Sequence, residues 1–376
     1  MGFFNRRDRA GAGAGAGADP NHVNGTKRSR HVNNKTYSMA TRPSFGQWLK
    51  VTWIDILTFV LMGALGLGIY EAPPAPNRSF AVTFTDGEVV YPQFAYPLRK
   101  EIIPIWLAAF LAAIIPILAI LIMQIRVRSF WDVNNGIIGL LYSLIGAAVF
   151  QVFVKWLIGG LRPHFLDACK PDISLARDQV LNAAGFNQIY FTPDICTGDR
   201  KEINDSLESM PSGHTTAAFG GFVYLYLYLN AKLKVFANYH APMWKLIVIY
   251  IPILGAVLIG GALTIDEYHN WYDVFAGAVI GTVFAFSAYR MSYAAIWDWR
   301  WNHVPLNRHQ PCLYTHDGAE LMDAMWTRQA GWGTGSSSHH DKHATSGHNT
   351  YSSGAAGPGV TRKAVPNSSR QGDEMV

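Results

Sequence analysis

Residues 243–265 read MWKLIVIYIPILGAVLIGGALTI, an apolar run long enough to cross the hydrocarbon core of a bilayer as a single helix. Working outward from this run in both directions, we find five more stretches of similar length and character. They are Val51–Tyr70, Ile102–Ile125, Asn134–Ile158, Gly213–Asn230 and Asp273–Trp297. We therefore expect an all-α polytopic membrane protein with six transmembrane helices in a bundle.

The overall composition agrees with a membrane protein. Of the 376 residues, 49% are hydrophobic and only 15% are charged, whereas soluble globular domains carry roughly a quarter charged residues. The alternative is a soluble core of buried helices, but six apolar runs would then lack amphipathic partners to cover them. We place the membrane domain at residues 50–300.

The two ends of the chain, residues 1–49 and 301–376, are polar and of low complexity. A Gly-Ala repeat occupies Gly11–Ala18, and the C-terminal tail is rich in Gly, Ser, His and Asn. Neither end has enough apolar surface to offset the entropy of ordering, so we expect both to be disordered. A solvated tail explains its histidines better than a metal site, because nothing rigid would preorganise the ligands. These histidines are His339, His340, His343 and His348.

Charge predicts how the bundle is oriented in the membrane. Six spans place both termini on one side, where most of the basic residues behind the net charge of +5 also lie. The positive-inside rule makes that side cytosolic and the opposite loops lumenal or extracellular, in an endomembrane or the plasma membrane. We find no basic face interleaved with aromatic residues that would indicate nucleic acid. The basic residues on the expected cytosolic side include Arg42, Lys50, Arg126, Arg128, Lys232, Lys234, Arg290 and Arg300.

The long loop between the third and fourth runs contains two of the three cysteines, Cys169 and Cys196. In an oxidising compartment they can form a disulfide, and two free thiols remain the alternative, because sequence does not give their separation. Two glycosylation sequons, at Asn77 and Asn204, also lie on the expected lumenal side, so sugar on either would support this topology.

Three polar motifs stand at the ends of apolar runs, and the topology puts all three on the same face of the membrane. In the first, Lys155 ends the third run and Arg162-Pro163 follows it. A lysine near a span end commonly reaches toward the headgroups, and Arg162-Pro163 alone equally describes a helix stop. Together they offer two cations to one anion, with the planar arginine fork able to bind it through several hydrogen bonds.

The second motif is Pro211-Ser212-Gly213-His214. Ser212 can cap the helix that follows. Gly213 lets an anion approach free backbone N–H groups, and a helix N-terminus favours negative charge. The plainer interpretation is a capped helix start beside a chance histidine. In the phosphate-binding interpretation, His214 stands next to the phosphate as a general acid.

The third motif is His269 followed four residues later by Asp273. If this stretch is helical, the two side chains share a face. A carboxylate that accepts a hydrogen bond from one imidazole nitrogen leaves the other nitrogen free to attack. The alternative is a polar pair at a helix start in which Asp273 serves as a cap.

Taken together, Lys155-x6-Arg162-Pro163, Pro211-Ser212-Gly213-His214 and His269-x3-Asp273 resemble the three-part signature of the lipid phosphate phosphatases. These enzymes belong to the type 2 phosphatidic acid phosphatase and vanadium haloperoxidase superfamily. The stretch LRPHFLD at residues 161–167 resembles the eukaryotic membrane branch. The resemblance covers roughly residues 50–300 and includes the six-span layout.

This resemblance implies a double displacement on a phospholipid or sphingolipid phosphate, such as phosphatidate, lysophosphatidate, a sphingoid-base phosphate or diacylglycerol pyrophosphate. His269 would attack phosphorus to form a phosphohistidine, with Asp273 orienting the ring. His214 would protonate the leaving alkoxide and then activate water. Lys155, Arg162, Ser212 and Gly213 would bind the phosphate oxygens, so that no metal or other cofactor is expected.

The sequence departs from the family pattern at one point. The family's third motif opens with Ser-Arg, and the matching positions here are Ala262 and Leu263. By analogy with the loss of one oxyanion donor, the missing arginine would lower the rate by about 10²–10³-fold. Two alternatives therefore stay open: a catalytically weakened lipid-binding or lipid-translocating member, and a lipid phosphotransferase. The preferred lipid and the oligomeric state are not determined by the sequence.

Overall fold

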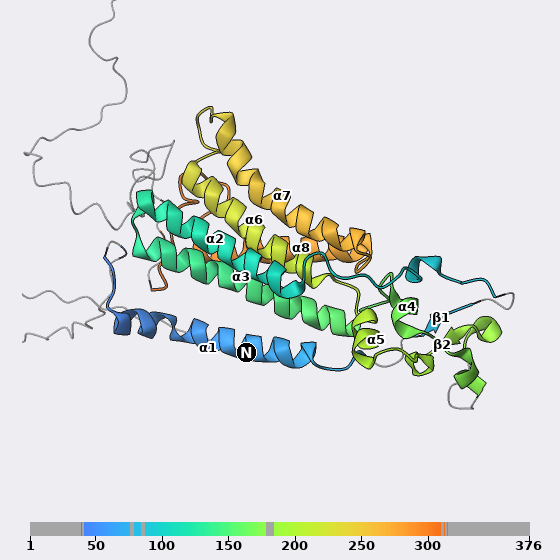
Figure 1. The fold of residues 1–376 in the computed structure, drawn as a ribbon. Helices are drawn as coiled ribbons and strands as arrows, with labels where there is room; N and C mark the ends of the chain where they lie inside the picture. The colour runs from blue at the N-terminus through green and yellow to red at the C-terminus, as the bar shows by residue number, and fades with distance from the viewer. Residues whose placement is uncertain are drawn as a thin grey trace, which may run out of the picture.

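The computed structural model describes residues 39, 41–75, 79–83, 87–177, 184–309, 312 and 314. Six long helices, all roughly aligned, form the body of this part of the chain (Figure 1). They are α1 (Phe45–Tyr70), α2 (Ile105–Val127), α3 (Phe130–Leu157), α6 (Gly213–Leu233), α7 (Met243–Ile265) and α8 (Trp271–Ser292). Each overlaps one of the six apolar runs, with ends that differ by up to six residues.

Local sequence explains where several of these helices begin. The side chains of Ser44, Ser129 and Ser212 accept hydrogen bonds from the first turns of α1, α3 and α6. Pro116 and Pro252 lie inside α2 and α7. Interior prolines break helices in water, but they are tolerated in membrane helices, where neighbouring groups satisfy the freed carbonyls.

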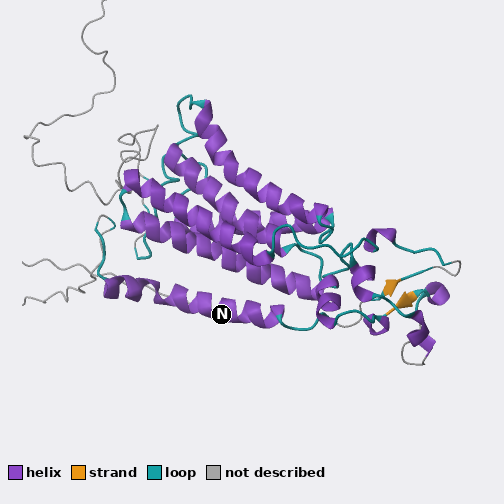
Figure 2. Cartoon of the chain, viewed as in Figure 1, coloured by secondary structure: helices purple, strands orange, loops and turns teal. Residues whose placement is uncertain are grey.

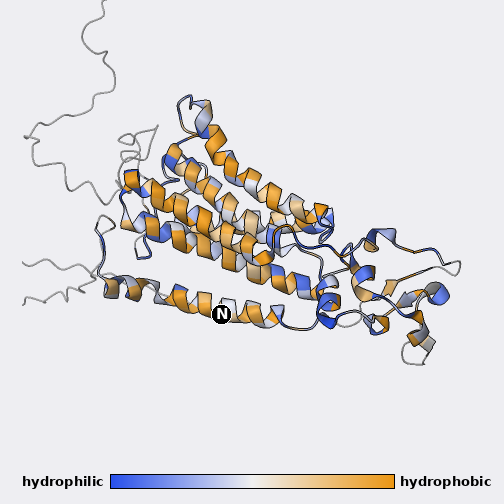
Figure 3. Cartoon of the chain, viewed as in Figure 1, coloured by the Kyte–Doolittle hydropathy of each residue, from blue (hydrophilic) through white to orange (hydrophobic). Residues whose placement is uncertain are grey.

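Five of the six long helices are long and apolar enough to cross a membrane; α6 is not in that set. Helix α6 packs against α2, α3, α7 and α8, and nearly all its residues are buried. A helix surrounded by other helices does not need an apolar surface toward lipid, and α6 accordingly carries threonine, tyrosine, asparagine and lysine. The six-span layout therefore remains a prediction. Figure 3 shows the apolar residues along the outer helices and polar residues at their ends.

Glycines allow α6 to approach its neighbours closely. A Cβ added at Gly281 of α8 would lie 2.5 Å from the Thr216 carbonyl oxygen, and one at Gly221 would lie 2.1 Å from the Ala112 carbonyl oxygen. Side chains at these positions would therefore meet backbone atoms. Small residues at helix crossings are typical of membrane bundles, where close backbone packing replaces the hydrophobic effect.

A small polar subdomain covers one end of the bundle, where α3 and α7 end and α6 and α8 begin (Figure 1). Its two-residue strands form one antiparallel pair (Figure 2), the only sheet among the described residues. Phe80, Phe165 and Ile195 belong to its own hydrophobic core. Its elements are β1 (Phe80–Ala81), η1 (Pro92–Phe94), α4 (Phe165–Cys169), η2 (Ile173–Arg177), η3 (Phe186–Gln188), β2 (Tyr190–Phe191), η4 (Pro193–Ile195) and α5 (Arg200–Ser206).

Cys169 and Cys196 form a disulfide in this subdomain, with their Cα atoms 4.7 Å apart. Of the two states that the sequence left open, the structure has the bridge. The disulfide ties the end of α4 to the residue after η4, and therefore holds together the loop that follows Arg162. The sequon at Asn204 lies in α5, whereas Asn77 falls outside the described residues.

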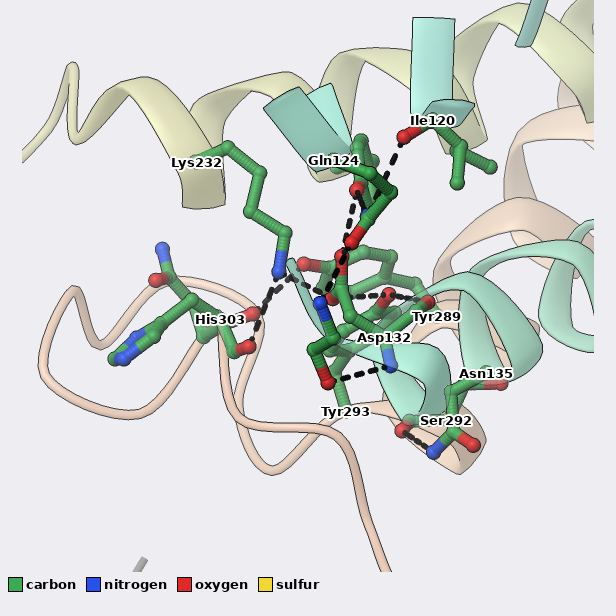
Figure 4. A network of polar contacts seen from close by, with 12 residues as sticks. Ile120, Gln124, Asp132, Asn135, Lys232, Tyr289, Ser292, Tyr293 and His303 are labelled. Carbon is green, nitrogen blue, oxygen red and sulfur yellow. Dashed lines mark hydrogen bonds and ion pairs between the residues drawn. The ribbon is translucent and has the colours of Figure 1, made fainter. Parts of the chain in front are cut away.

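A buried polar network occupies the opposite end of the bundle (Figure 4). The Lys232 ammonium lies 2.5 Å from Asp132 Oδ1, and both side chains are fully buried. Asp132 also accepts hydrogen bonds from Tyr228 and Tyr293. Lys232 donates a further hydrogen bond to the His303 carbonyl, which belongs to a segment that we expected in the tail.

The C-terminal segment after α8 thus continues the fold for some distance. Trp301, His303 and Val304 are buried, and Arg308 pairs with Asp55 of α1. We placed the start of the tail at residue 301, but this segment has polar partners on the bundle that single-sequence composition does not reveal. The rest of the tail and the Gly-Ala repeat lie outside the described residues.

Candidate active site

The three polar motifs meet at the end of the bundle that the small subdomain covers. Lys155 lies in the last turn of α3, Ser212 caps α6, and Asp273 lies in the first turn of α8. The Ser212 backbone N–H donates to the Asp273 carbonyl at 3.1 Å, which joins the starts of α6 and α8. Gln151 of α3 donates to the Pro211 carbonyl at 2.9 Å and attaches the same turn to the third helix.

Two histidines face each other within this cluster. The ring centroids of His214 and His269 are 6.4 Å apart, with an angle of 70° between the ring planes. Their exposures are only 5% and 2%. Within the described part of the chain, His214 Nε2 and His269 Nδ1 make no hydrogen bond although both are buried. Buried polar atoms without partners are costly, so their presence here points to a ligand or a reaction.

The third motif differs from a simple helical pair. The stretch is not helical at His269, because α8 begins only at Trp271. His269 Nδ1 nevertheless lies 3.5 Å from Asp273 Oδ2, which is close for an ion pair and long for a hydrogen bond. Asp273 Oδ2 also accepts from the Asn270 backbone N–H at 2.9 Å, so Asp273 completes a capping box whose N-cap is Asn270, as well as facing His269.

Ser209 is a contact that the sequence motifs did not identify. Its hydroxyl donates to Asp273 Oδ2 at 2.5 Å. A single serine three residues before Ser212 carries no spacing signal by which it could have been found. With Asn270 and Ser209 both bonded to Oδ2, the orientation of the Asp273 carboxylate is fixed from two sides.

The local electrostatics favour a neutral His269. Burial lowers its pKa well below the usual value, and the nearby charges of Arg162 and Lys155 lower it further. Lys155 is 8% exposed, so it does not extend to the membrane surface as a lysine at a span end commonly does. The cluster therefore combines a neutral imidazole with two buried cations.

Arg162 is held over the site by two contacts. Its Nη2 donates to Asp205 Oδ1 of α5 at 2.7 Å, and its guanidinium carbon lies 5.5 Å from the ring centroid of Tyr268. Burial alone would raise the pKa of Asp205, but Arg162 and Lys155 outweigh it and keep the pKa below its usual value. Asp205 is therefore an ionised partner of Arg162 at neutral pH.

Leu263 stands where the family pattern would have an arginine, and its side chain is fully buried. Its carbonyl accepts hydrogen bonds from the backbone N–H groups of Tyr268 and His269 at 3.2 and 3.1 Å, so the position still shapes the turn that carries His269. Arg200 and Lys201, two basic residues of the long loop before α6, are exposed at the start of α5.

A cavity of about 580 Å³ opens next to this cluster. Two residues that line the cavity contact residues of the motifs. Asp205 is bonded to Arg162, and Glu101 Oε1 lies 4.0 Å from His214 Nε2. Within the described ranges, no group of three or more His, Cys, Asp or Glu side chains is arranged to hold a metal ion. The residues that line the cavity are Lys100, Glu101, Ile102, Pro104, Asp205 and Tyr268.

Comparison with known proteins places this chain in a family. Residues 136–297 match the model of the PAP2 superfamily. A PA-phosphatase related-family protein of Dictyostelium discoideum is 33% identical over 266 residues, which cover 70% of this chain and 75% of that protein. The chain belongs to the PAP2 superfamily. All seven candidate residues of this PAP2 chain, from Lys155 to Asp273, lie within the matched range.

Other relatives of this PAP2 chain have more specific names. Lipid phosphate phosphatase 1 of Arabidopsis thaliana is 32% identical over 207 residues, which cover 55% of this chain and 60% of that protein. Diacylglycerol pyrophosphate phosphatase 1 of Saccharomyces cerevisiae is 29% identical over 246 residues, which cover 65% of this chain and 80% of that protein. No solved structure matches this chain.

Proposed function

We propose that this PAP2-superfamily chain is an integral membrane phosphatase that hydrolyses lipid phosphate monoesters, phosphatidate among them, through a phosphohistidine on His269. The observation that carries the proposal is the pair of buried histidines beside two buried cations, Lys155 and Arg162, at one end of an apolar bundle. The names of the relatives support a lipid phosphate or diacylglycerol pyrophosphate as the substrate class.

In the first step, His269 is the nucleophile. Its Nδ1 faces Asp273, so Nε2 carries the free electron pair and bonds to phosphorus. The bond from phosphorus to the ester oxygen breaks, and its electron pair stays on that oxygen. His214 Nε2 gives a proton to the oxygen and releases the lipid alcohol.

In the second step, the same groups act in reverse. His214 removes a proton from water, the hydroxide oxygen bonds to phosphorus, and the electron pair of the P–N bond returns to His269. Lys155, Arg162, Ser212 and the Gly213 amide bind the three remaining phosphate oxygens through both steps. Fixed donors of this kind stabilise the transition state without reorganising, which is commonly the largest contribution to catalysis.

The proposal assigns the phosphate charge to protein cations and requires no metal ion. Phosphate release from short-chain phosphatidate in detergent micelles with EDTA tests this directly. Wild-type protein is expected to release phosphate, and His269→Ala to lose the activity. The matched control is His240→Ala, an exposed histidine between α6 and α7 at the other end of the bundle.

Either of two results would overturn the proposal. Activity that EDTA abolishes would contradict the metal-independent mechanism. If the wild-type protein released no phosphate from any of a panel of lipid phosphates, a lipid-binding or lipid-translocating role would be favoured. The observation that supports this alternative is Leu263 at the position where the family pattern has arginine. A turnover that depends on an added alcohol acceptor would indicate the phosphotransferase.

We further propose that the site lies on the lumenal or extracellular face, with the termini cytosolic. The Cys169–Cys196 disulfide supports this orientation, because stable disulfides form in oxidising compartments. We expect Asn204 to carry sugar in intact cells. Enzymatic deglycosylation should then shift the gel mobility of the wild-type protein, and Asn204→Gln should abolish that shift. Modification of the N-terminal sequons at Asn24 or Asn34 instead would reverse the topology.

A further inference from the structure

The segment at residues 96–104 belongs to none of the three motifs, yet it is fastened to the loops that carry two of them. The Leu98 backbone N–H donates to Asp167 Oδ2 at 2.8 Å, in the short helix α4 that follows Arg162. The Ile102 backbone N–H donates to Asp266 Oδ2 at 3.1 Å, in the turn that carries His269. These bonds place the segment against the site from outside the motifs.

The same segment holds the ring of His214 on both sides. The ring makes a hydrogen bond to the Ile103 backbone, while Nε2 lies 4.0 Å from Glu101 Oε1. Nε2 is buried and makes no hydrogen bond to any described residue. A separation of 4.0 Å is within ion-pair range but too long for a hydrogen bond, so Nε2 is not engaged by Glu101 and can contact a third group.

The charges around His214 explain why this contact matters. Burial disfavours a positive imidazole at His214 most strongly, and the charges of Arg162 and Lys155 disfavour it further. Among the carboxylates nearby, Asp205 is already bonded to Arg162, and Asp266 accepts from Ile102. Glu101 is the carboxylate that lies within ion-pair range of the His214 ring in the described part of the chain. Its negative charge opposes the effect of the two cations.

We propose that Glu101 is a positioning residue that keeps a proton on His214 Nε2 for expulsion of the lipid alcohol. The inference rests on the proposed function. The proton passes from Nε2 to the ester oxygen as the P–O bond breaks and its electron pair moves to that oxygen. His214 is left neutral and Glu101 negative, and His214 regains a proton from the water that attacks in the second step.

Two properties of Glu101 suit this role. It lines the cavity, so the leaving oxygen can reach the group that it supports. Burial raises the pKa of Glu101, and the positive charge of Arg162 opposes that rise. The charge of Arg162 thus favours the ionised form of Glu101, which is the form that stabilises a protonated imidazole nearby.

The test compares two leaving groups. An alkyl alcohol needs a proton as it leaves, whereas 4-nitrophenolate leaves readily without one. The value of kcat/KM covers the steps up to formation of the phosphohistidine, and therefore isolates the step in which His214 is the acid. Glu101→Gln keeps the shape of the side chain and removes its charge. We expect it to lower kcat/KM about 10-fold on dioctanoyl phosphatidate and less than about 2-fold on 4-nitrophenyl phosphate. The 10-fold loss is smaller than the 10²–10⁴-fold contribution typical of a general acid, because His214 itself is still present.

Control variants separate this role from others. Glu202→Gln removes an exposed carboxylate of α5 on the same face and is expected to leave both substrates unaffected. His214→Ala removes the acid itself, and therefore gives the largest difference between the two substrates in the loss of kcat/KM. Glu101→Asp, which retains the charge but withdraws it by one methylene group, is expected to fall between wild type and Glu101→Gln, and provides a second variant if Glu101→Gln unfolds.

The outcomes are distinct. An equal loss on both substrates would overturn the inference and make Glu101 a phosphate-binding or structural residue. No loss on either would also overturn it and leave the proposed function intact. Failure of the wild-type protein on both substrates would instead overturn the proposed function, and this inference with it.

Discussion

Arg162 and Asp205 are joined by a hydrogen bond of 2.7 Å across the mouth of the proposed phosphate site. The arginine is buried, whereas the side chain of the aspartate is about half exposed. The arginine that we propose to bind phosphate is thus already bound to a carboxylate before any substrate arrives. A phosphate oxygen and Asp205 would compete for the same donor, because both are anions that prefer the guanidinium fork.

The first prediction follows from this competition. Asp205→Asn keeps an oxygen that can accept from Arg162 Nη2 but removes the negative charge next to the phosphate. We expect inorganic phosphate and vanadate to inhibit about 2–5-fold more strongly, the size of a single partly exposed charge interaction. Inhibition constants measured on wild type, Asp205→Asn and the control Glu202→Gln decide the question. Weaker inhibition of the Asn variant would mean that the charge is needed to orient Arg162.

The depressed pKa of His269 predicts the acid side of the pH profile. Because burial and two cations keep the folded-state pKa well below 6.5, the imidazole stays neutral and nucleophilic as the pH falls through that value. We expect kcat/KM, corrected for ionisation of the substrate phosphate, to persist at pH 6 and to fall only at lower pH. A corrected profile that falls around pH 6.5 would contradict the assignment.

Helix packing gives a third prediction. Gly281→Ala places a methyl group 2.5 Å from the Thr216 carbonyl oxygen and 2.7 Å from the Gly220 nitrogen, so α6 and α8 must separate. We expect a loss of about 1–3 kcal/mol in the free energy of unfolding, typical of an overpacked contact.

Gly261→Ala in α7 meets nothing within 4 Å and is the matched control. It is expected to be neutral or slightly stabilising, since alanine has the higher helix propensity. Thermal unfolding in detergent compares the two, and equal melting temperatures would contradict this packing.

The buried network in Figure 4 gives a fourth prediction. Lys232→Met leaves Asp132 with a buried charge and no cation, a change that typically costs about 3–5 kcal/mol. Adding Asp132→Asn in the double variant should recover part of that loss. Because the network lies at the end of the bundle away from His214 and His269, turnover per folded molecule should be unchanged. Melting temperature and active fraction measured together test both statements, and a fall in turnover at constant folded fraction would contradict the second.

Much of the bundle could be predicted from the sequence, because its signal is local. Runs such as Met243–Ile265 carry a single charged residue, Lys245, and that helix has the bounds that we expected. The serine cap of α6 and the positions of Lys155 and Arg162 are likewise properties of neighbouring residues. Helix α6 is the instructive exception. The sequence predicts a membrane span there, but only the structure shows that four helices surround α6, so that its polar side chains do not face lipid.

The sequence by itself therefore determined the helices, the three motifs and the end of the bundle at which they would meet. Tertiary structure decided the rest, because the deciding partners are far apart along the chain. Glu101 lies 113 residues before His214, and Ser209 lies 64 residues before Asp273. No periodicity or spacing connects residues that only the packing of α3, α6 and α8 and the subdomain above them brings within reach.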